Sequence, residues 1–135
     1  MEKFKILEHT ADLKIKVFGK TKEELFKNAL FAMAKALCSE PKSQKIINRK
    51  IKNKSFNSEM LLVDFLSEVL YLSQVKKEVY FDVRFKKFSD TEIEGELFGK
   101  KVERFSEDIK GVTYHNLSIK QREDKIFEAI IVFDL

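Results

Sequence analysis

Apolar side chains recur every three or four positions in two stretches of the first half of the chain, a spacing typical of helices with one buried face. The first stretch predicts a helix from Lys22 to Leu37. Thr21 and Glu24 fit a capping box, in which Thr21 accepts a bond from the third helical amide and Glu24 reaches back to the amide of Thr21. Pro41 disfavours helical backbone at the residue before it and marks the end.

A second helix is predicted from Glu59 to Ser73. Asn57 and Ser58 offer an N-cap directly before it, and Glu59 places a negative charge in the first turn. A broad apolar stripe follows, which predicts that this helix is largely buried. The stripe consists of Leu61, Leu62, Phe65, Leu66, Val69 and Leu70.

Elsewhere apolar residues alternate with polar ones, as in half-buried strands. A first strand is predicted at Leu13–Val17, with Phe4–Leu7 as a strand end or an extended entry, and the segment Lys42–Lys54 is expected at a sheet edge. The last apolar run has hardly any polar position, which is typical of a central strand covered on both faces. The later strands are expected at Val79–Phe85, Ile93–Leu97, Val112–Ile119 and Ile126–Phe133.

This order of elements predicts an α+β fold with one domain over residues 1–135. Two helices would pack on a largely antiparallel (mixed) β-sheet and share one core with it. Hydrophobic residues make up 44% of the chain and charged residues 36%, which is a globular mixture and excludes a disordered segment.

The charge balance is mildly basic, because 26 lysines and arginines oppose 22 acidic residues and leave a net charge of +4. Such a charge favours an anionic partner without requiring one. Much of it lies in Lys42–Lys54, which contains no aromatic residue for stacking on a base. Two interpretations stay open for this segment: lysines that protect a sheet edge from other strands, and contact with RNA or another anion.

Cys38 is the one cysteine, so no internal disulfide forms and a reducing compartment is expected. Its apolar surroundings predict a small buried side chain rather than a nucleophile. The N-terminal residues carry no signal-peptide pattern, and no stretch has the roughly 18 apolar residues of a membrane span. A cytoplasmic protein without a membrane partner is expected, as a monomer or weak oligomer.

Two polar stretches interrupt otherwise ordinary strands. Glu8–Asp12 holds His9 and a carboxylate three residues away, an arrangement found at strand entries and also in metal or acid–base sites. Lys110–Asn116 holds Thr113 and His115, which share one face if the backbone is extended. Structural roles and functional roles both remain open for these residues.

The C-terminal residues suggest a third candidate site. Asp134 and the α-carboxylate of Leu135 lie together at the end of the predicted central strand, where two negative groups repel each other. A frayed, solvated end would relieve the repulsion, and a bound hard cation such as Ca²⁺ or Mg²⁺ would also tie the strand down.

Other signals of catalysis are absent from the sequence. It has no glycine-rich dinucleotide motif, no phosphate-binding loop and no cysteine cluster for zinc. With no clear nucleophile or general base, the chain is not expected to be an enzyme.

Four stretches in order resemble the archease family. Glu8–Leu13 is similar to the family's N-terminal EHTAD motif, and Phe18–Phe26 to its turn into the first helix. Lys110–Leu117 is similar to the family's KxxTYH stretch, and Asp134 followed by Leu135 matches its ending in Asp plus an aliphatic residue. The order, spacing and total length agree, so the resemblance covers essentially the whole chain, with Lys14 in place of a small residue as one departure.

This resemblance implies a protein cofactor rather than a catalyst. Archeases assist the GTP-dependent RNA ligase of tRNA splicing by promoting guanylylation of its active-site histidine and sustaining multiple turnover. The family's metal site maps onto Asp12, Asp134 and Leu135, with Ca²⁺ expected first and Mg²⁺ as an alternative. We therefore expect Asp12 and Asp134 to lie side by side on neighbouring antiparallel strands and to share the cation with Leu135. His9, Thr113 and His115 fall in the surrounding motifs and are expected to orient the ligands or contact the partner.

Two rival functions remain open on the sequence alone. A small basic RNA-binding or chaperone-like module would bind nucleic acid without the ligase and with steep salt dependence. A hydrolase using a cation at Asp12 and Asp134 would turn over substrate by itself. The ligase activator is expected to have the ligase as its protein partner, with tRNA contacted only indirectly.

Overall fold

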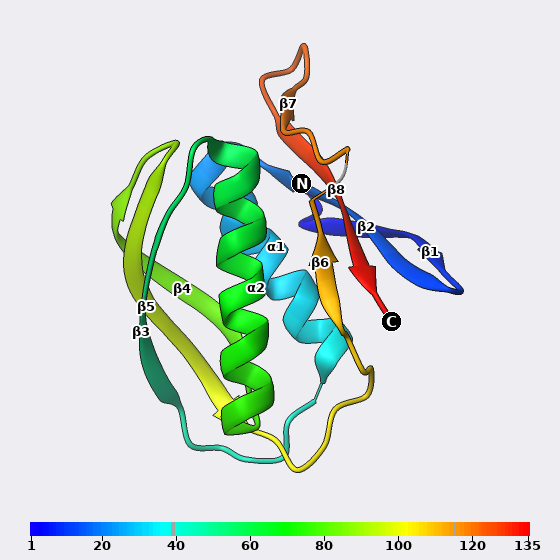
Figure 1. Cartoon of the computed structure of the whole chain (residues 1–135), viewed down its shortest axis with the longest axis vertical. Coiled ribbons are helices and arrows are strands. Elements are labelled where there is room, and N and C mark those ends of the chain that lie inside the picture. Colours follow the sequence, from blue (N-terminus) through cyan, green and yellow to red (C-terminus); the bar gives the residue numbers. More distant parts are fainter. Residues whose placement is uncertain (39, 115) are drawn as a thin grey trace.

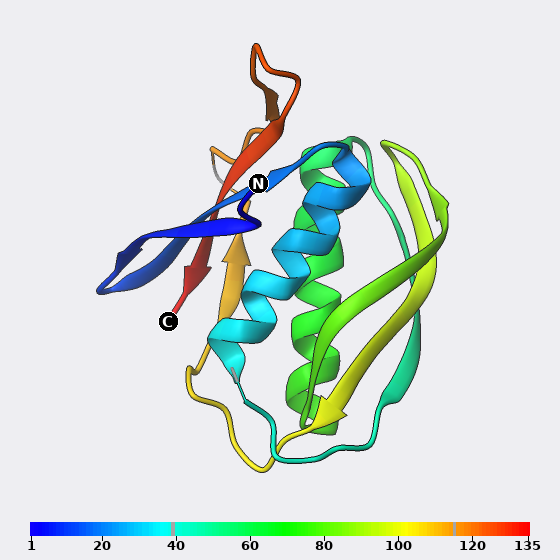
Figure 2. The ribbon, with the colours of Figure 1, turned by 180° about the vertical axis from the view of Figure 1, so that it is seen from behind.

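Two helices lie between two β-sheets, as Figures 1 and 2 show from opposite sides. The computed structural model describes residues 1–38, 40–114 and 116–135. The helices are α1 (Lys22–Leu37) and α2 (Ser58–Lys76). One sheet contains β1 (Phe4–His9), β2 (Asp12–Gly19), β6 (Gly111–Thr113), β7 (Lys120–Gln121) and β8 (Phe127–Asp134). The other contains β3 (Ile47–Lys54), β4 (Glu78–Phe88) and β5 (Glu92–Lys101).

The strand order is β1-β2-β8-β6 in the first sheet, with β7 also paired to β8, and β3-β5-β4 in the second. All six pairings among the described residues are antiparallel. The predicted α+β class is therefore confirmed, with two corrections: the strands form two sheets instead of one, and neither sheet is mixed. Periodicity could not reveal this division, because it shows which residues are buried and not which strand they pair with.

One buried cluster joins both sheets and both helices, as expected of a shared core. Phe26 of α1 stacks on Phe65 of α2 with ring centroids 5.9 Å apart. Phe88 of β4 meets Phe26 edge-on at 5.0 Å, so aromatic contacts link both helices to the three-stranded sheet. Among the described residues, neither helix is long and apolar enough to cross a membrane.

The first helix has the predicted bounds, and Thr21 Oγ1 accepts a hydrogen bond from the Glu24 amide at 3.0 Å. One detail differs from the prediction. Glu24 Oε1 accepts from the amide of Lys20 at 2.9 Å, one residue earlier than the expected Thr21. Gly19 lies just before this cap, and a Cβ there would come 2.3 Å from the Leu25 nitrogen, so only glycine lets β2 approach α1 so closely.

The second helix is longer than predicted. Asn57 caps it by accepting from the Met60 amide at 2.8 Å, but the helix continues past Ser73 to Lys76. The next residue, Lys77, is the C-cap and adopts the left-handed conformation (φ 54°) that glycine or asparagine usually occupies. A lysine at that position gives no stop signal in the sequence.

The expected strand at Val112–Ile119 is largely wrong. Only Gly111–Thr113 pairs with β8, as β6. The chain then turns, with the Leu117 amide donating to the Tyr114 carbonyl at 3.0 Å and Asn116 at a φ of 61°. Asparagine tolerates this conformation, so the alternation of apolar residues here reflects a loop over the core rather than a strand.

Both positional predictions about strands are confirmed. The basic segment supplies β3 at one edge of the three-stranded sheet, and β8 is central in the five-stranded sheet. The expectation that both faces of β8 are covered is only half right. Its inward side chains are buried, but Ile130 on the outer face is 41% exposed, so no other layer covers this part of the face.

Candidate metal centre

Asp12 and Asp134 lie directly opposite each other in the β2–β8 ladder. Side chains of directly paired residues in an antiparallel ladder point to the same face, so the two carboxylates share the outer face of the sheet. The register is fixed by the inner face, where Leu13 pairs with Phe133 and both side chains are buried. A slip of either strand by one residue would turn its own apolar side chain from the core to the outer face. The predicted adjacency of the two aspartates is confirmed.

The third strand of the site orients Asp134. Thr113 Oγ1 donates to Asp134 Oδ1 at 2.7 Å, and the Lys110 amide donates to the Asp134 carbonyl at 2.7 Å. Gly111 pairs with Asp134, and a Cβ on Gly111 would come 3.2 Å from Asp134 Oδ2. The absence of a side chain there keeps the second carboxylate oxygen accessible.

Asp12 is exposed, whereas Asp134 and Leu135 are half-buried. The Asp12 carboxylate has no hydrogen bond or ion pair within the described part of the chain. Lys14 shares its face, but Lys14 Nζ lies 3.8 Å from Glu8 Oε1 on β1. The lysine that departs from the family pattern is therefore drawn towards the neighbouring strand, and its charge is partly balanced there.

His9 lies on the other face of the β1–β2 hairpin. It pairs with Leu13, whose side chain points to the core, and its Nε2 contacts Glu107 Oε1. Glu107 belongs to the loop between β5 and β6, which is held at two further points. The Ser106 amide donates to the Leu37 carbonyl at 2.7 Å, and Lys110 bonds Asp134 as described above. His9 thus anchors the segment that leads into the site, and the contact with Glu107 carried no signal in the sequence.

The predicted residues can now be placed. Asp12, Thr113 and Asp134 come together on one face, Leu135 follows Asp134 directly, and His9 points to the opposite face. His115 lies outside the described residues. Gly111 belongs to the site although the sequence analysis did not single it out, and its place within the KxxTYH-like stretch was the available signal.

The donor set can be compared with the cation it was predicted to hold. No group of three or more histidine, cysteine, aspartate and glutamate side chains that could hold a metal exists among the described residues. The site has two carboxylates on one face, one of them held by Thr113 and open above Gly111. Carboxylate oxygens suit hard cations, so the residues fit Ca²⁺ or Mg²⁺ provided that further oxygen donors complete the shell.

Comparison with known proteins decides the family. A model described as the Archease protein family (MTH1598/TM1083) matches residues 4–135. This chain belongs to the archease family. The archease of Methanosarcina barkeri is 36% identical to it over 99% of this chain and 97% of the relative. The archease of Pyrococcus furiosus is 30% identical, and all of both chains is covered.

Solved structures agree with the fold of this archease-family chain. The solution structure of Methanobacterium thermoautotrophicum protein 1598 superposes with a TM-score of 0.72 at 26% identity, covering 100% of both chains. A crystal structure of an archease from Thermotoga maritima, described as a possible chaperone, gives a TM-score of 0.66 at 22% identity over 97% of this chain and 96% of that one. The resemblance seen in the four sequence motifs is confirmed.

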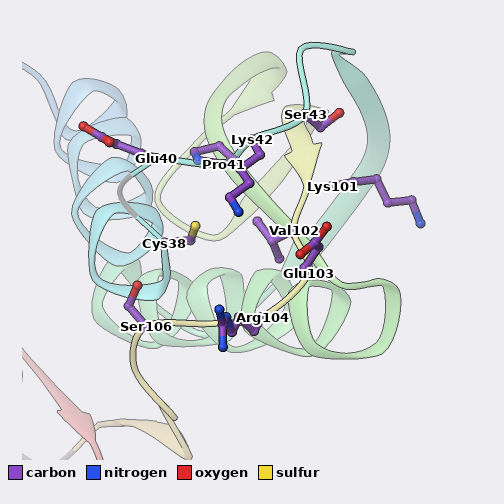
Figure 3. A pocket seen from close by; sticks show the side chains of 10 residues that line it. All are labelled: Cys38, Glu40, Pro41, Lys42, Ser43, Lys101, Val102, Glu103, Arg104 and Ser106. Carbon is purple, nitrogen blue, oxygen red and sulfur yellow. The ribbon is translucent and has the colours of Figure 1, made fainter.

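A hollow near the end of α1 provides a contrast with the carboxylate site of this archease. It encloses about 560 Å³ and is shown in Figure 3. Cys38 lines it and is half-buried, close to the predicted buried thiol. Charges of both signs line it, from Glu40 and Glu103 and from Lys42, Lys101 and Arg104. This mixture gives the hollow no carboxylate set like that of Asp12 and Asp134.

Proposed function

We propose that this archease-family protein activates the GTP-dependent RNA ligase of tRNA splicing. It would do so by promoting guanylylation of the ligase and thereby sustaining multiple turnover, without catalysing a reaction itself. Membership of the family supports the proposal, and so does the motif-by-motif match that carries the functional residues. The single structural observation behind it is the direct pairing of Asp12 with Asp134 on one face.

In this proposal Asp12, Asp134 and the α-carboxylate of Leu135 hold one divalent cation, Ca²⁺ first and Mg²⁺ as the alternative. The cation would supply positive charge that relieves the repulsion between carboxylates and gives the face a defined shape for the ligase. Thr113 orients the Asp134 carboxylate through its 2.7 Å hydrogen bond, and Gly111 leaves space above it. The half-buried Asp134 fixes the position, and the exposed Asp12 faces solvent.

The proposal is tested with purified ligase, GTP and RNA carrying the matching ends. We expect the ligase alone to stop after about one turnover, and the added protein to increase both the guanylylated fraction and the product formed per ligase. Chelation of divalent cations before mixing, followed by transfer into the minimum cation that the ligase needs, should remove the stimulation. Unchanged product per ligase with the added protein would contradict the proposal.

The same preparations address the rival functions. The isolated protein is expected to turn over no substrate and to bind RNA only weakly at physiological salt. Nuclease activity that persists through clean purification would support the hydrolase instead. Submicromolar RNA binding with steep salt dependence would support the nucleic-acid module.

Thr113→Val should weaken cation binding while leaving both aspartates in place. The substitution removes the hydrogen bond to Asp134 Oδ1, and loss of such an orienting partner costs about 10–100-fold in metal affinity. Titration calorimetry with Ca²⁺ measures the change. Thr113→Ser keeps the hydroxyl and should restore most of the affinity, and an equal loss in both variants would show that the hydroxyl plays no orienting role.

A further inference from the structure

β3 is an open edge of the three-stranded sheet, because it pairs with β5 alone among the described residues. Its exposed face carries lysines at every second position, at Lys50, Lys52 and Lys54. Each of these lies directly opposite a glutamate of β5: the pairs are Lys50 with Glu96, Lys52 with Glu94, and Lys54 with Glu92. β3 therefore already accepts one strand whose outward residues are acidic at alternate positions.

Two of these glutamates also interact with lysines of β4, which lies on the opposite side of β5. Lys86 of β4 lies 3.9 Å from Glu94, and Lys87 of β4 forms an ion pair with Glu92. The three lysines of β3 make no ion pair with any residue in the described ranges. After the hydrogen bond from Lys87, the charges of Lys54 and Lys52 help to hold the pKa of Glu92 below its usual value, so β5 balances the outer row of β3 in part. The row remains a line of positive charge beside backbone groups that the edge leaves unpaired.

The inner side of the same edge is flanked by α2. Asn53 Nδ2 donates to Glu68 Oε2 at 2.7 Å, and Ser55 Oγ donates to Asp64 Oδ2 at 2.5 Å, so one stripe of α2 runs along β3. Figures 1 and 2 both show α2 beside β3. Tyr71 and Val75 continue this stripe, because they lie seven and eleven positions after Asp64 and so return to the same side of the helix.

These two side chains are unusually exposed for apolar residues on a packed helix. Tyr71 is 63% exposed and Val75 is 61% exposed. Since α2 runs antiparallel to β3 after the turn at Phe56, Tyr71 and Val75 lie beyond Glu68 along β3, towards its N-terminal half. The open edge therefore has a basic row on its outer side and an apolar pair on its inner side.

We propose that the β3 edge binds an extended segment of a partner protein, added as a further strand, whose side chains alternate between acidic and apolar. The acidic residues would face outward beside Lys50, Lys52 and Lys54, as the glutamates of β5 do on the other side. The apolar residues would face inward onto Tyr71 and Val75. Main-chain bonds supply affinity in such strand addition, and the alternating side chains supply specificity.

The same charges exclude a second copy of this chain as the occupant. Pairing of two β3 strands would bring two lysine rows together, and like charges facing each other across strands are destabilising. An RNA strand is less well matched, because it cannot extend the main-chain ladder of the open edge, and the inner side offers it one hydroxyl, on Tyr71, beside the apolar Val75. The lysines of the β3 edge thus attract an acidic strand and repel a second β3 strand.

The test uses the full chain and a fluorescent twelve-residue peptide that alternates glutamate and valine. Three probes are compared with it: the same peptide with lysine for glutamate, a shuffled peptide of equal composition, and a single-stranded RNA of equal length. Fluorescence anisotropy is expected to show binding of the alternating acidic peptide alone. Hydrogen exchange should show new protection of the β3 amides when that peptide is bound.

Charge variants test whether the peptide binds at the β3 edge. Lys50→Glu with Lys52→Glu should lower peptide affinity at least about tenfold, because two attractions become repulsions. Lys5→Glu, a charge reversal of the same kind at an exposed position of β1 in the other sheet, should change it less than about twofold. Asp12→Asn should bind the peptide like the natural chain, since the carboxylate site lies in the other sheet.

Three outcomes would overturn the proposal. The first is absence of binding or equal binding of the lysine peptide. The second is a β3 double variant that binds normally while its circular dichroism remains native. The third is RNA that binds β3 more tightly than the acidic peptide, which would assign the edge to nucleic acid. Tyr71→Ser gives an independent check, because it should weaken the peptide several-fold without changing any charge.

Discussion

Asp134→Asn and Asp12→Asn should each abolish stimulation of the ligase while leaving the fold intact. Asparagine keeps the size of aspartate, and at position 134 it keeps an oxygen that can accept the 2.7 Å bond from Thr113. What is lost is one of the negative charges that hold the cation. We expect at least a tenfold loss of Ca²⁺ affinity, about 1.4 kcal/mol, and a guanylylated fraction no higher than with ligase alone.

Stability measurements separate this effect from damage to the fold. With a chelator present, each variant should be at least as stable as the natural chain, because like charges directly opposite each other in a ladder are destabilising. With Ca²⁺, the natural chain should gain stability in proportion to the logarithm of cation concentration, and the variants should gain little. Asp82→Asn on β4, an exposed aspartate of the other sheet that forms an ion pair with Lys27 at 3.7 Å, is the matched control.

An added glycine after Leu135 tests the third donor. It moves the terminal carboxylate away from Asp134 and should impair stimulation without altering either aspartate. Normal stimulation by both asparagine variants, with native folds, would show that the site assignment is wrong. Normal stimulation by the extended chain alone would reduce the site to the two aspartates.

Arg49→Met is expected to destabilise the protein strongly, and more than Glu78→Gln does, since it leaves a buried carboxylate without its main partner. Glu78 is fully buried, and Arg49 binds both its oxygens, Nε to Oε1 at 3.0 Å and Nη2 to Oε2 at 2.8 Å. The Tyr80 hydroxyl donates to Oε1 at 2.5 Å, and Lys101 Nζ lies 3.7 Å from Oε2. These two contacts remain in the variant but cannot replace a bidentate pair.

Glu78→Gln should cost less, about 1–3 kcal/mol. The glutamine is neutral and can still accept a bond, and the Arg49 side chain is 36% exposed, so its charge can be solvated when the carboxylate is gone. Urea unfolding of both variants measures the difference. A larger loss for Glu78→Gln than for Arg49→Met would contradict the view that the buried carboxylate is the costly member of the pair.

The pH dependence of stability gives a second measure of the same cluster. Burial acts to raise the pKa of Glu78, but the hydrogen bonds from Arg49 and Tyr80 and the positive charges of Arg49 and Lys101 outweigh it, so the pKa lies below its usual value. Stability from this group is therefore present above the unfolded-state pKa of about 4.3 and lost as the pH falls towards the folded-state value. Glu78→Gln should remove that part of the acid sensitivity.

The first helix could be predicted in full because its signals are local. Thr21 and Glu24 mark its start and Pro41 its end, all within a few residues of the boundaries. The second helix lacks such a stop, since Lys77 takes the left-handed position without being glycine. The sequence also could not predict Glu78 in the core, because its partner Arg49 lies on another strand and the pairing exists only after folding.

The candidate site likewise combines features that could be predicted from the sequence with contacts that only the folded structure shows. Asp12 and Asp134 could be predicted as neighbours because the family resemblance assigns both to one metal site, and the β2–β8 ladder pairs them directly. The family resemblance supplied Thr113, and the structure gives it a partner. His9 and Glu107 could not be paired in advance, since Glu107 lies in a loop with no periodicity. Alternation predicts which face a side chain takes, whereas loop contacts depend on the tertiary fold.

The order of elements along the chain has a consequence for synthesis. Both helices and the whole three-stranded sheet lie between Lys22 and Lys101, so they can associate as the ribosome delivers them. β2 emerges early but must wait for β8, its partner from the far end of the described chain. Pairings between such distant segments form slowly, and an unpaired strand edge invites aggregation meanwhile. The carboxylate face, which needs both strands, should therefore form after the three-stranded sheet.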